Sequence, residues 1–162
     1  MKRRDKLFLT AALLLAAGLL AVLFWRVRPL TGHISAFRYD WGHVWDGYQV
    51  YGIFTEDDTV YAKRAFEATD GMAYPAESWE MTAALTDEES AAFDKLILNT
   101  LRLPNWKDRY EPKIDTYDAS SWYIHYTWNG KEYSTSGYAV FPDGLAQIRD
   151  FFDSLDWPDQ PG

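Results

Sequence analysis

Histidine and carboxylate side chains at close spacing could bind a metal ion in this chain, but their pattern does not predict it. The three histidines of the 162-residue chain are His33, His43 and His125. His43 lies between Asp40 and Asp46. Alternation along a strand would place the two acids on one face and His43 on the other, unless Gly42 forms a bulge. We therefore predict no metal site.

The sequence does not support nucleophilic or acid–base catalysis either. A Ser/His/Asp triad brings three groups together in space, and the chain has no Gly-x-Ser-x-Gly motif. Glycoside hydrolysis needs two carboxylates at a fixed separation, which the sequence does not define. The acids Asp87, Glu88 and Glu89 have no second carboxylate cluster to complete a cation site. We predict that the protein is not an enzyme and has neither catalytic residues nor cofactor.

Aromatic side chains are the residues most suited to binding. The chain has 8 Trp, 11 Tyr and 9 Phe, and a flat row of exposed rings would bind the faces of sugars. With His125, the rings form a predicted ligand-binding surface of Trp41, Trp45, Tyr48, Tyr123 and His125. The alternative interpretation is that the rings only fill the core, because strands favour aromatic residues.

The first 28 residues predict a membrane anchor. An unbroken apolar run from Leu7 to Trp25 follows four cations and precedes Arg26 and Arg28. At about 1.5 Å per residue, a helix of this length spans roughly 28 Å, close to the hydrocarbon thickness of a bilayer. More cations precede the run than follow it, which predicts a cytoplasmic N-terminus and an extracytoplasmic C-terminal part.

A cleaved secretory signal peptide is the competing interpretation of this segment. Signal peptides have an apolar stretch of about 7 to 15 residues that ends in a small-x-small site. Seven more apolar residues follow the small residues Ala16-Ala17-Gly18. Cleavage there would leave an apolar new N-terminus, so the length and the flanks favour an uncleaved signal anchor.

Charge is divided unevenly along the chain. Residues 1–28 hold six Lys or Arg and one acid, whereas residues 29–162 hold ten cations and 23 acids. So acidic a domain repels phosphate groups, which argues against nucleic acid as a partner. The chain also lacks cysteine and Asn-x-Ser/Thr acceptor sites. These features fit a bacterial cell surface.

Period-two alternation predicts an N-terminal β-meander. Ser35, Phe37, Tyr39 and Trp41 share one face of a first strand. The dipeptide Asp46-Gly47 predicts a tight hairpin. Two more strands follow, over 48–54 and 60–68, and a short fourth strand lies near residue 81.

Helical periodicity with start and stop signals predicts the first helix. The pattern Thr86-Asp87-Glu88-Glu89 is a capping box. A buried stripe of Phe93, Leu96, Ile97, Thr100 and Leu101 follows, and Pro104 ends the helix. We interpret residues 105–120 as a loop.

The clearest hairpin follows this loop. Alternating residues lead to the turn Asn129-Gly130, whose two residues fix the register. The predicted cross-strand pairs are Trp128 with Lys131, Tyr126 with Tyr133, Ile124 with Thr135, and Trp122 with Gly137. A second helix begins at its N-cap Asp143 and buries Leu145, Ile148, Phe152 and Leu155.

The order of elements predicts an α+β fold: an antiparallel sheet of N-terminal meander and C-terminal hairpin, with two helices on one face and a transmembrane helix before it. The predicted segments are a cytoplasmic basic flank (1–6), a transmembrane helix (7–25), a stalk (26–33), an extracytoplasmic domain (34–155) and a flexible tail (156–162).

Residues 121–155 resemble a known group of domains. Trp122-Tyr123-Ile124 leads to Asn129-Gly130-Lys131, and Ser136-Gly137-Tyr138 precedes Phe141-Pro142 and the helix Ile148–Leu155. This pattern resembles small uncharacterised extracytoplasmic domains of Gram-positive-type bacteria, found on membrane-anchored or lipid-anchored proteins. The resemblance implies the topology and the fold, and it implies no activity.

Two functions follow from these observations. The first is a single-pass, membrane-anchored module at the cell surface, whose exposed sheet face or edge strand binds another extracytoplasmic protein without catalysis. The second is a carbohydrate or cell-wall binding module that uses exposed aromatic rings. The expected partners are the bilayer, through Leu7 to Trp25, and an extracytoplasmic protein or glycan, with no nucleic acid.

Overall fold

The computed structural model describes residues 14–16, 18, 28–43, 47–67, 79–114 and 116–158. Contacts divide the chain into two units, Met1–Leu30 and Thr31–Gly162. Most of the predicted transmembrane helix 7–25 lies outside the described residues. The residues of this segment that are described, 14–16 and Gly18, are helical and exposed. Among the residues that are described, no helix combines the length and apolar character that a membrane span requires.

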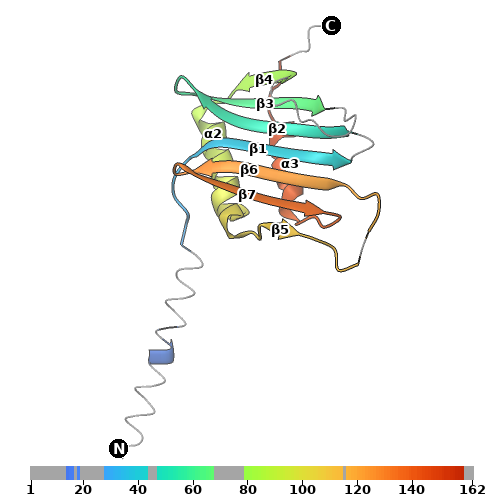
Figure 1. Ribbon diagram of the computed structural model, residues 1–162. Coiled ribbons are helices and arrows are strands. Elements are labelled where there is room, and N and C mark those ends of the chain that lie inside the picture. Colours follow the sequence, from blue (N-terminus) through green and yellow to red (C-terminus); the bar gives the residue numbers. More distant parts are fainter. Residues whose placement is uncertain are drawn as a thin grey trace, which may run out of the picture. The chain divides into compact units, whose positions relative to one another are not determined.

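The second unit is an α+β domain built on a seven-stranded sheet (Figure 1). Its strands are β1 (Ile34–His43), β2 (Gly47–Glu56), β3 (Thr59–Glu67), β4 (Met81–Ala84), β5 (Arg109–Tyr110), β6 (Ser121–Trp128) and β7 (Lys131–Tyr138). Its helical elements are α2 (Asp87–Lys95), a π-helical turn η1 (Leu96–Thr100), a 3₁₀ turn η2 (Leu103–Asn105) and α3 (Gly144–Asp153).

The strand order is β4-β3-β2-β1-β6-β7-β5. The meander β1–β4 and the hairpin β6–β7 join where β1 pairs antiparallel with β6. All pairs are antiparallel except β5 with β7, which is parallel. The mostly antiparallel α+β sheet is therefore confirmed, whereas the prediction that 105–120 is only a loop is wrong, because β5 lies within it.

Both helices pack on one face of the sheet (Figure 1). Phe37 of β1 contacts Phe93 of α2, with ring centroids 5.0 Å apart, and also stacks on Phe152 of α3. Phe152 in turn stacks on Tyr51 of β2. All four side chains are buried, so the aromatic residues of these strands and helices form the core.

The start of β1 differs from the predicted alternation. The pairing of β1 with β6 shifts register between Ile34 and Ala36. As a result Ile34 is fully buried and Ser35 is exposed. The predicted sharing of one face by Ser35 and Phe37 is therefore wrong, because a bulge adds a residue at this point.

Helix α2 begins at the predicted cap, but its C-terminal part differs from the predicted helix. Thr86 and Glu89 form the expected capping box. The chain then continues as η1, which turns Leu98 into the core and leaves Thr100 exposed. The predicted place of Thr100 in the buried stripe is wrong, because the wider π turn rotates the residues after Lys95.

Helix α3 buries Leu145, Ile148 and Phe152, and Leu155, just beyond its end, is also buried, as the periodicity predicted. Asp143 is its N-cap, but the Asp143 side chain makes no capping hydrogen bond. Beyond the helix, the Trp157 indole Nε1 donates to the Phe152 carbonyl oxygen at 2.8 Å. Residues 159–162 of the predicted tail lie outside the described residues.

Candidate functional site

The face of the sheet opposite α2 and α3, here called the open face, holds the candidate site. Alternation along β1 directs Phe37 and Tyr39 to the helices and Arg38 and Asp40 to the open face. Arg38 pairs with His125 of β6, and Asp40 pairs with Tyr123. Paired residues on neighbouring antiparallel strands project to the same side, so these four side chains meet.

These four residues, Arg38, Asp40, Tyr123 and His125, line a cavity of about 310 Å³, here called the open-face pocket. Its volume is at the lower end of the range for small-ligand sites, about 300 to 1,000 Å³. Because all four side chains come from the regular strands β1 and β6, the backbone ladder between these strands fixes their spacing.

An ion pair lies at the base of the pocket. The Arg38 Nε donates to Asp40 Oδ1 at 2.8 Å and to Oδ2 at 3.1 Å. Asp40 is only 4% exposed. Burial raises the pKa of Asp40, while the hydrogen bond and charge of Arg38 and the charge of His125 act in the opposite direction. The pair places a fixed donor group and a fixed acceptor group side by side with no net charge.

Trp79 covers part of the open face beside the pocket. The Arg38 guanidinium lies 5.9 Å from the Trp79 ring centroid, and the same ring contacts Phe54 edge-on. Trp79 also packs against the buried cluster of Tyr48, Val50 and Ala65. The open face is thus packed over β2 and β3, and the pocket lies beside this packed region, at β1 and β6.

The rim of the pocket is accessible. Tyr123 is 38% exposed, and His125 is exposed beside it. On β7 their cross-strand neighbours are Ser136 and Ser134. These serines are small and at least partly exposed, so a ligand can approach the Tyr123 and His125 rings from the β7 side.

The structure brings together two of the five predicted surface residues, Tyr123 and His125. Trp41 lies on the helix-covered face, where the Arg149 guanidinium of α3 is 4.6 Å from its ring centroid. Tyr48 is buried, and its hydroxyl group is 2.8 Å from the Ser121 Oγ. Trp45 lies outside the described residues.

The predicted platform of Trp41, Tyr48 and Tyr123 therefore does not form, because these rings lie on two faces or in the core. Sequence reasoning missed Arg38 and Asp40 as site residues. The signal was present, since the β1 alternation placed both on the face opposite the aromatic stripe. Polar residues on that face are ordinarily solvated, so the alternation alone does not mark them as site residues.

The arrangement suits binding. Among the described residues, no three His, Cys, Asp or Glu side chains lie close enough together to hold a metal ion. The pocket contains one carboxylate, held by Arg38, whereas glycoside hydrolysis uses two. What the four residues offer is an accessible aromatic ring, an imidazole and an ion pair of fixed geometry.

Exposed apolar side chains lie at the end of the sheet nearest the pocket. Ile114 and Tyr117 are 80% and 87% exposed in the connection before β6, and Phe141 is 44% exposed after β7. The β6 start and the β7 end are joined in register at Ser121 and Tyr138. The chain enters β1 at Ile34, which pairs with Trp128 at the opposite end of β6. We call the Ser121 end the distal end.

Comparisons of the chain with protein-family models, with curated proteins and with solved structures found no match. The likeness of residues 121–155 to extracytoplasmic domains of Gram-positive-type bacteria therefore stays a prediction.

Proposed function

We propose that the chain is a single-pass, membrane-anchored protein whose extracytoplasmic domain is a non-enzymatic protein-interaction module. Its contact surface is the open face around Arg38, Asp40, Tyr123 and His125. One observation carries the proposal: the helices cover a single face of the sheet, and the other face has a structured pocket with an accessible rim.

Two of the four residues of this surface, Arg38 and Tyr123, are of types that dominate binding energy in protein interfaces. Tyr and Arg are enriched among interface residues that cost the most on truncation. Arg38 is held by two hydrogen bonds to Asp40, so little side-chain freedom remains to be lost on binding. A partner that covers Tyr123 and His125 would bury an aromatic ring against a pre-formed polar base.

The pocket lies well along the strands from the point where the chain enters the sheet. The predicted anchor joins the sheet at Ile34, and Asp40 lies six residues further along β1. At about 3.3 Å per residue, the pocket is roughly 20 Å from this entry point. The exposed side chains of Ile114, Tyr117 and Phe141 are at the same distal end.

Glycan binding is the second candidate function, and the exposed Tyr123 ring beside the ion pair favours it. Sugar faces stack on aromatic rings, and sugar hydroxyl groups bond to paired donors and acceptors. The pocket has room for about one sugar ring, judged by the volumes of small-ligand sites. One accessible ring is a weaker basis than the row of rings that the sequence suggested, so the protein partner is preferred.

The test uses the purified full-length chain in detergent as bait for a bacterial envelope extract, beside pelleting with insoluble cell-wall glycan. The variant Tyr123→Ala/His125→Ala removes the rim and leaves the Arg38–Asp40 pair in place. Glu132→Ala, exposed on the same face of β7, is the matched control. We expect a discrete protein that the control captures and the double variant loses.

Retention of that protein by the double variant would contradict the proposed contact surface. Retention on glycan that depends on Tyr123, without any captured protein, would replace the first function by the second. Urea unfolding of both variants establishes that the rim substitutions leave the fold intact.

A further inference from the structure

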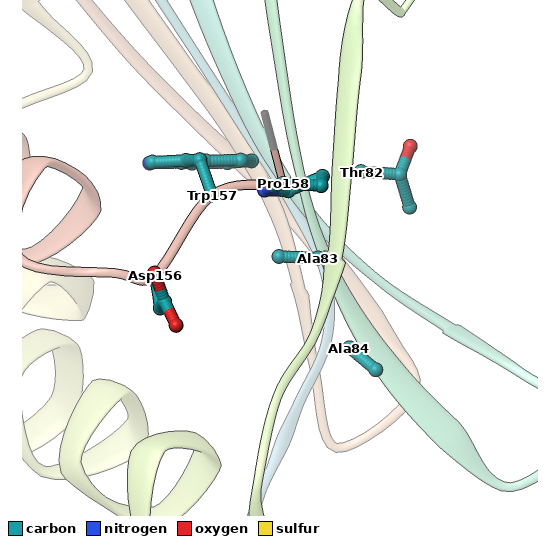
Figure 2. Close-up of a pocket in the computed structure, with 6 residues that line it drawn as sticks. All are labelled: Thr82, Ala83, Ala84, Asp156, Trp157 and Pro158. Carbon is teal, nitrogen blue, oxygen red and sulfur yellow. The ribbon is translucent and has the colours of Figure 1, made fainter. Parts of the chain in front are cut away.

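A second surface, independent of the open-face pocket, lies along the edge strand β4. Thr82, Ala83 and Ala84 of β4 and the segment Asp156–Pro158 line a groove of about 470 Å³. In the part of the chain that the structure describes, β4 is the outermost strand beyond β3. Figure 2 shows Ala83 on the side of β4 that faces Asp156 and Trp157, with Thr82 and Ala84 on the other side.

The hydrogen bonds between β4 and β3 show which backbone groups of β4 point away from the sheet. The Leu85 amide donates to the Val60 carbonyl oxygen of β3 at 2.8 Å. In an antiparallel pair, residues alternate between bonding the neighbouring strand and pointing away from it. The backbone N–H and C=O groups of Ala83 therefore point to β3, and those of Thr82 and Ala84 point away from β3.

The β4 edge is short, at four residues, but it lacks two features that ordinarily prevent pairing with another strand, namely charge and proline. Its sequence, Met-Thr-Ala-Ala, has no charged residue and no proline. Native proteins protect exposed edges with lysine, proline or bulges. The small side chains of Thr82, Ala83 and Ala84 leave space for another backbone to approach at about 4.8 Å, the spacing of paired strands.

Trp157 forms a fixed wall of this groove. Its indole Nε1 donates to the Phe152 carbonyl oxygen at 2.8 Å, and the Arg64 guanidinium lies 5.8 Å from its ring centroid. The ring is half-buried, while Asp156 beside it is exposed. The groove thus combines outward backbone groups, an aromatic wall and a carboxylate.

The negative charge of the domain indicates which kind of strand would pair with the β4 edge. Residues 29–162 hold ten cations against 23 acids, and Asp156 adds its carboxylate to the groove itself. A second copy of the chain would bring the same excess of negative charge, which opposes pairing. A positively charged segment would be attracted by it.

We propose that the β4 groove binds an extended, positively charged peptide segment of a partner protein, which adds to the sheet as a strand. Backbone hydrogen bonds from Thr82 and Ala84 hold the segment, Trp157 contacts an apolar side chain, and Asp156 pairs with a Lys or Arg. This site is separate from the open-face pocket and does not depend on the pocket's role.

The test measures fluorescence anisotropy of a labelled heptapeptide of alternating Lys and Val, titrated with the full-length chain in detergent. A peptide of alternating Glu and Val is the control probe. Thr82→Pro removes an outward N–H without removing a bond to β3, and edge strands tolerate such a proline. Thr82→Val keeps the N–H and is the matched control.

We expect Thr82→Pro to weaken binding of the Lys/Val peptide about tenfold, the equivalent of about 1.4 kcal/mol, close to the net value of one hydrogen bond. Thr82→Val should leave its affinity unchanged. Asp156→Asn, which does not alter the backbone of β4, should weaken binding and reduce its dependence on salt. Tyr123→Ala should have no effect, so failure of this site and failure of the open-face site are distinguishable.

Equal affinity of the Lys/Val and Glu/Val peptides would overturn the proposal. So would peptide binding unchanged by both Thr82→Pro and Asp156→Asn. Sedimentation that shows a dimer disrupted by Thr82→Pro, with no peptide binding, would assign the edge to a second copy and likewise reject the peptide.

Discussion

The indole of Trp122 lies directly over Gly137, its cross-strand partner in the β6–β7 hairpin. A Cβ atom added to Gly137 would lie 2.6 Å from the Trp122 Cε2. The indole Nε1 donates to the Val140 carbonyl oxygen at 2.8 Å, which holds the ring in place. Trp122 also contacts Trp106 and Tyr110, so this pair joins the hairpin to the segment that contains β5.

We expect Gly137→Ala to destabilise the domain by about 1 to 3 kcal/mol, because a methyl group cannot fit under a ring fixed on its other side. Urea unfolding measures this difference in the free energy of unfolding. Ser136→Ala, at the next position but on the open face, is the control and should have little effect. Equal stability of Gly137→Ala and the wild type would contradict the close contact.

The capping box of α2 gives a prediction with a pH dependence. The Thr86 N–H donates to Glu89 Oε2 at 2.8 Å, and the Glu89 N–H donates to the Thr86 Oγ1. We expect Thr86→Ala to cost about 1 kcal/mol at neutral pH. The hydrogen bonds from Thr86 lower the pKa of Glu89 in the folded protein. The stability that these bonds contribute is therefore present above the ordinary pKa of glutamate and is lost as the pH falls through the lowered pKa.

Unfolding of Thr86→Ala and the wild type at a series of pH values checks this prediction. The difference between them should shrink in acid, and Thr86→Ser, which keeps the hydroxyl group, should behave as the wild type. A cost that is the same at all pH values would contradict a contribution from the hydrogen bond between the Thr86 hydroxyl group and the Glu89 carboxylate.

The buried carboxyl of Asp40 gives the opposite pH dependence. Burial raises the pKa of Asp40 above its ordinary value of 3.8, against the influence of Arg38. Folding therefore favours the protonated form, and the free energy of unfolding falls as the pH rises through the two pKa values. Asp40→Asn removes this dependence while it keeps an acceptor for Arg38.

We expect the stability of Asp40→Asn relative to the wild type to increase as the pH is raised from about 4 toward neutrality. Urea unfolding across this range measures it. Asp143→Asn, at an exposed position, controls for the loss of one negative charge. A relative stability of Asp40→Asn that decreases with pH would mean that the Arg38 charge outweighs burial.

The features that the sequence predicted well are those with local causes. The turn Asn129-Gly130 has positive φ at both residues, 51° and 73°. A two-residue turn of this kind fixes the register of its strands, and all four predicted cross-strand pairs of the hairpin are present. The Thr86 cap and the stripe of α3 are local patterns of the same kind.

The features that were missed depend on contacts between distant segments. The strand β5 is two residues long and forms only because β7 offers its edge. The π turn η1 that buries Leu98 leaves no periodicity to detect. For the site, the meeting of Arg38 and Asp40 with Tyr123 and His125 needed the pairing of β1 with β6, across about 85 residues of sequence. No local signal specifies this pairing.

Placement of the domain outside the cytoplasm is the claim on which the proposed function depends, and cysteine labelling tests it most directly. The chain has no native cysteine, so each single-cysteine variant carries one reactive site. Ser134→Cys lies on the exposed open face of β7, and Lys6→Cys precedes the apolar run. A membrane-impermeant maleimide should label Ser134→Cys in intact bacterial cells and Lys6→Cys only after lysis. Labelling of Lys6→Cys alone in intact cells, or of neither variant before lysis, would contradict an extracytoplasmic domain.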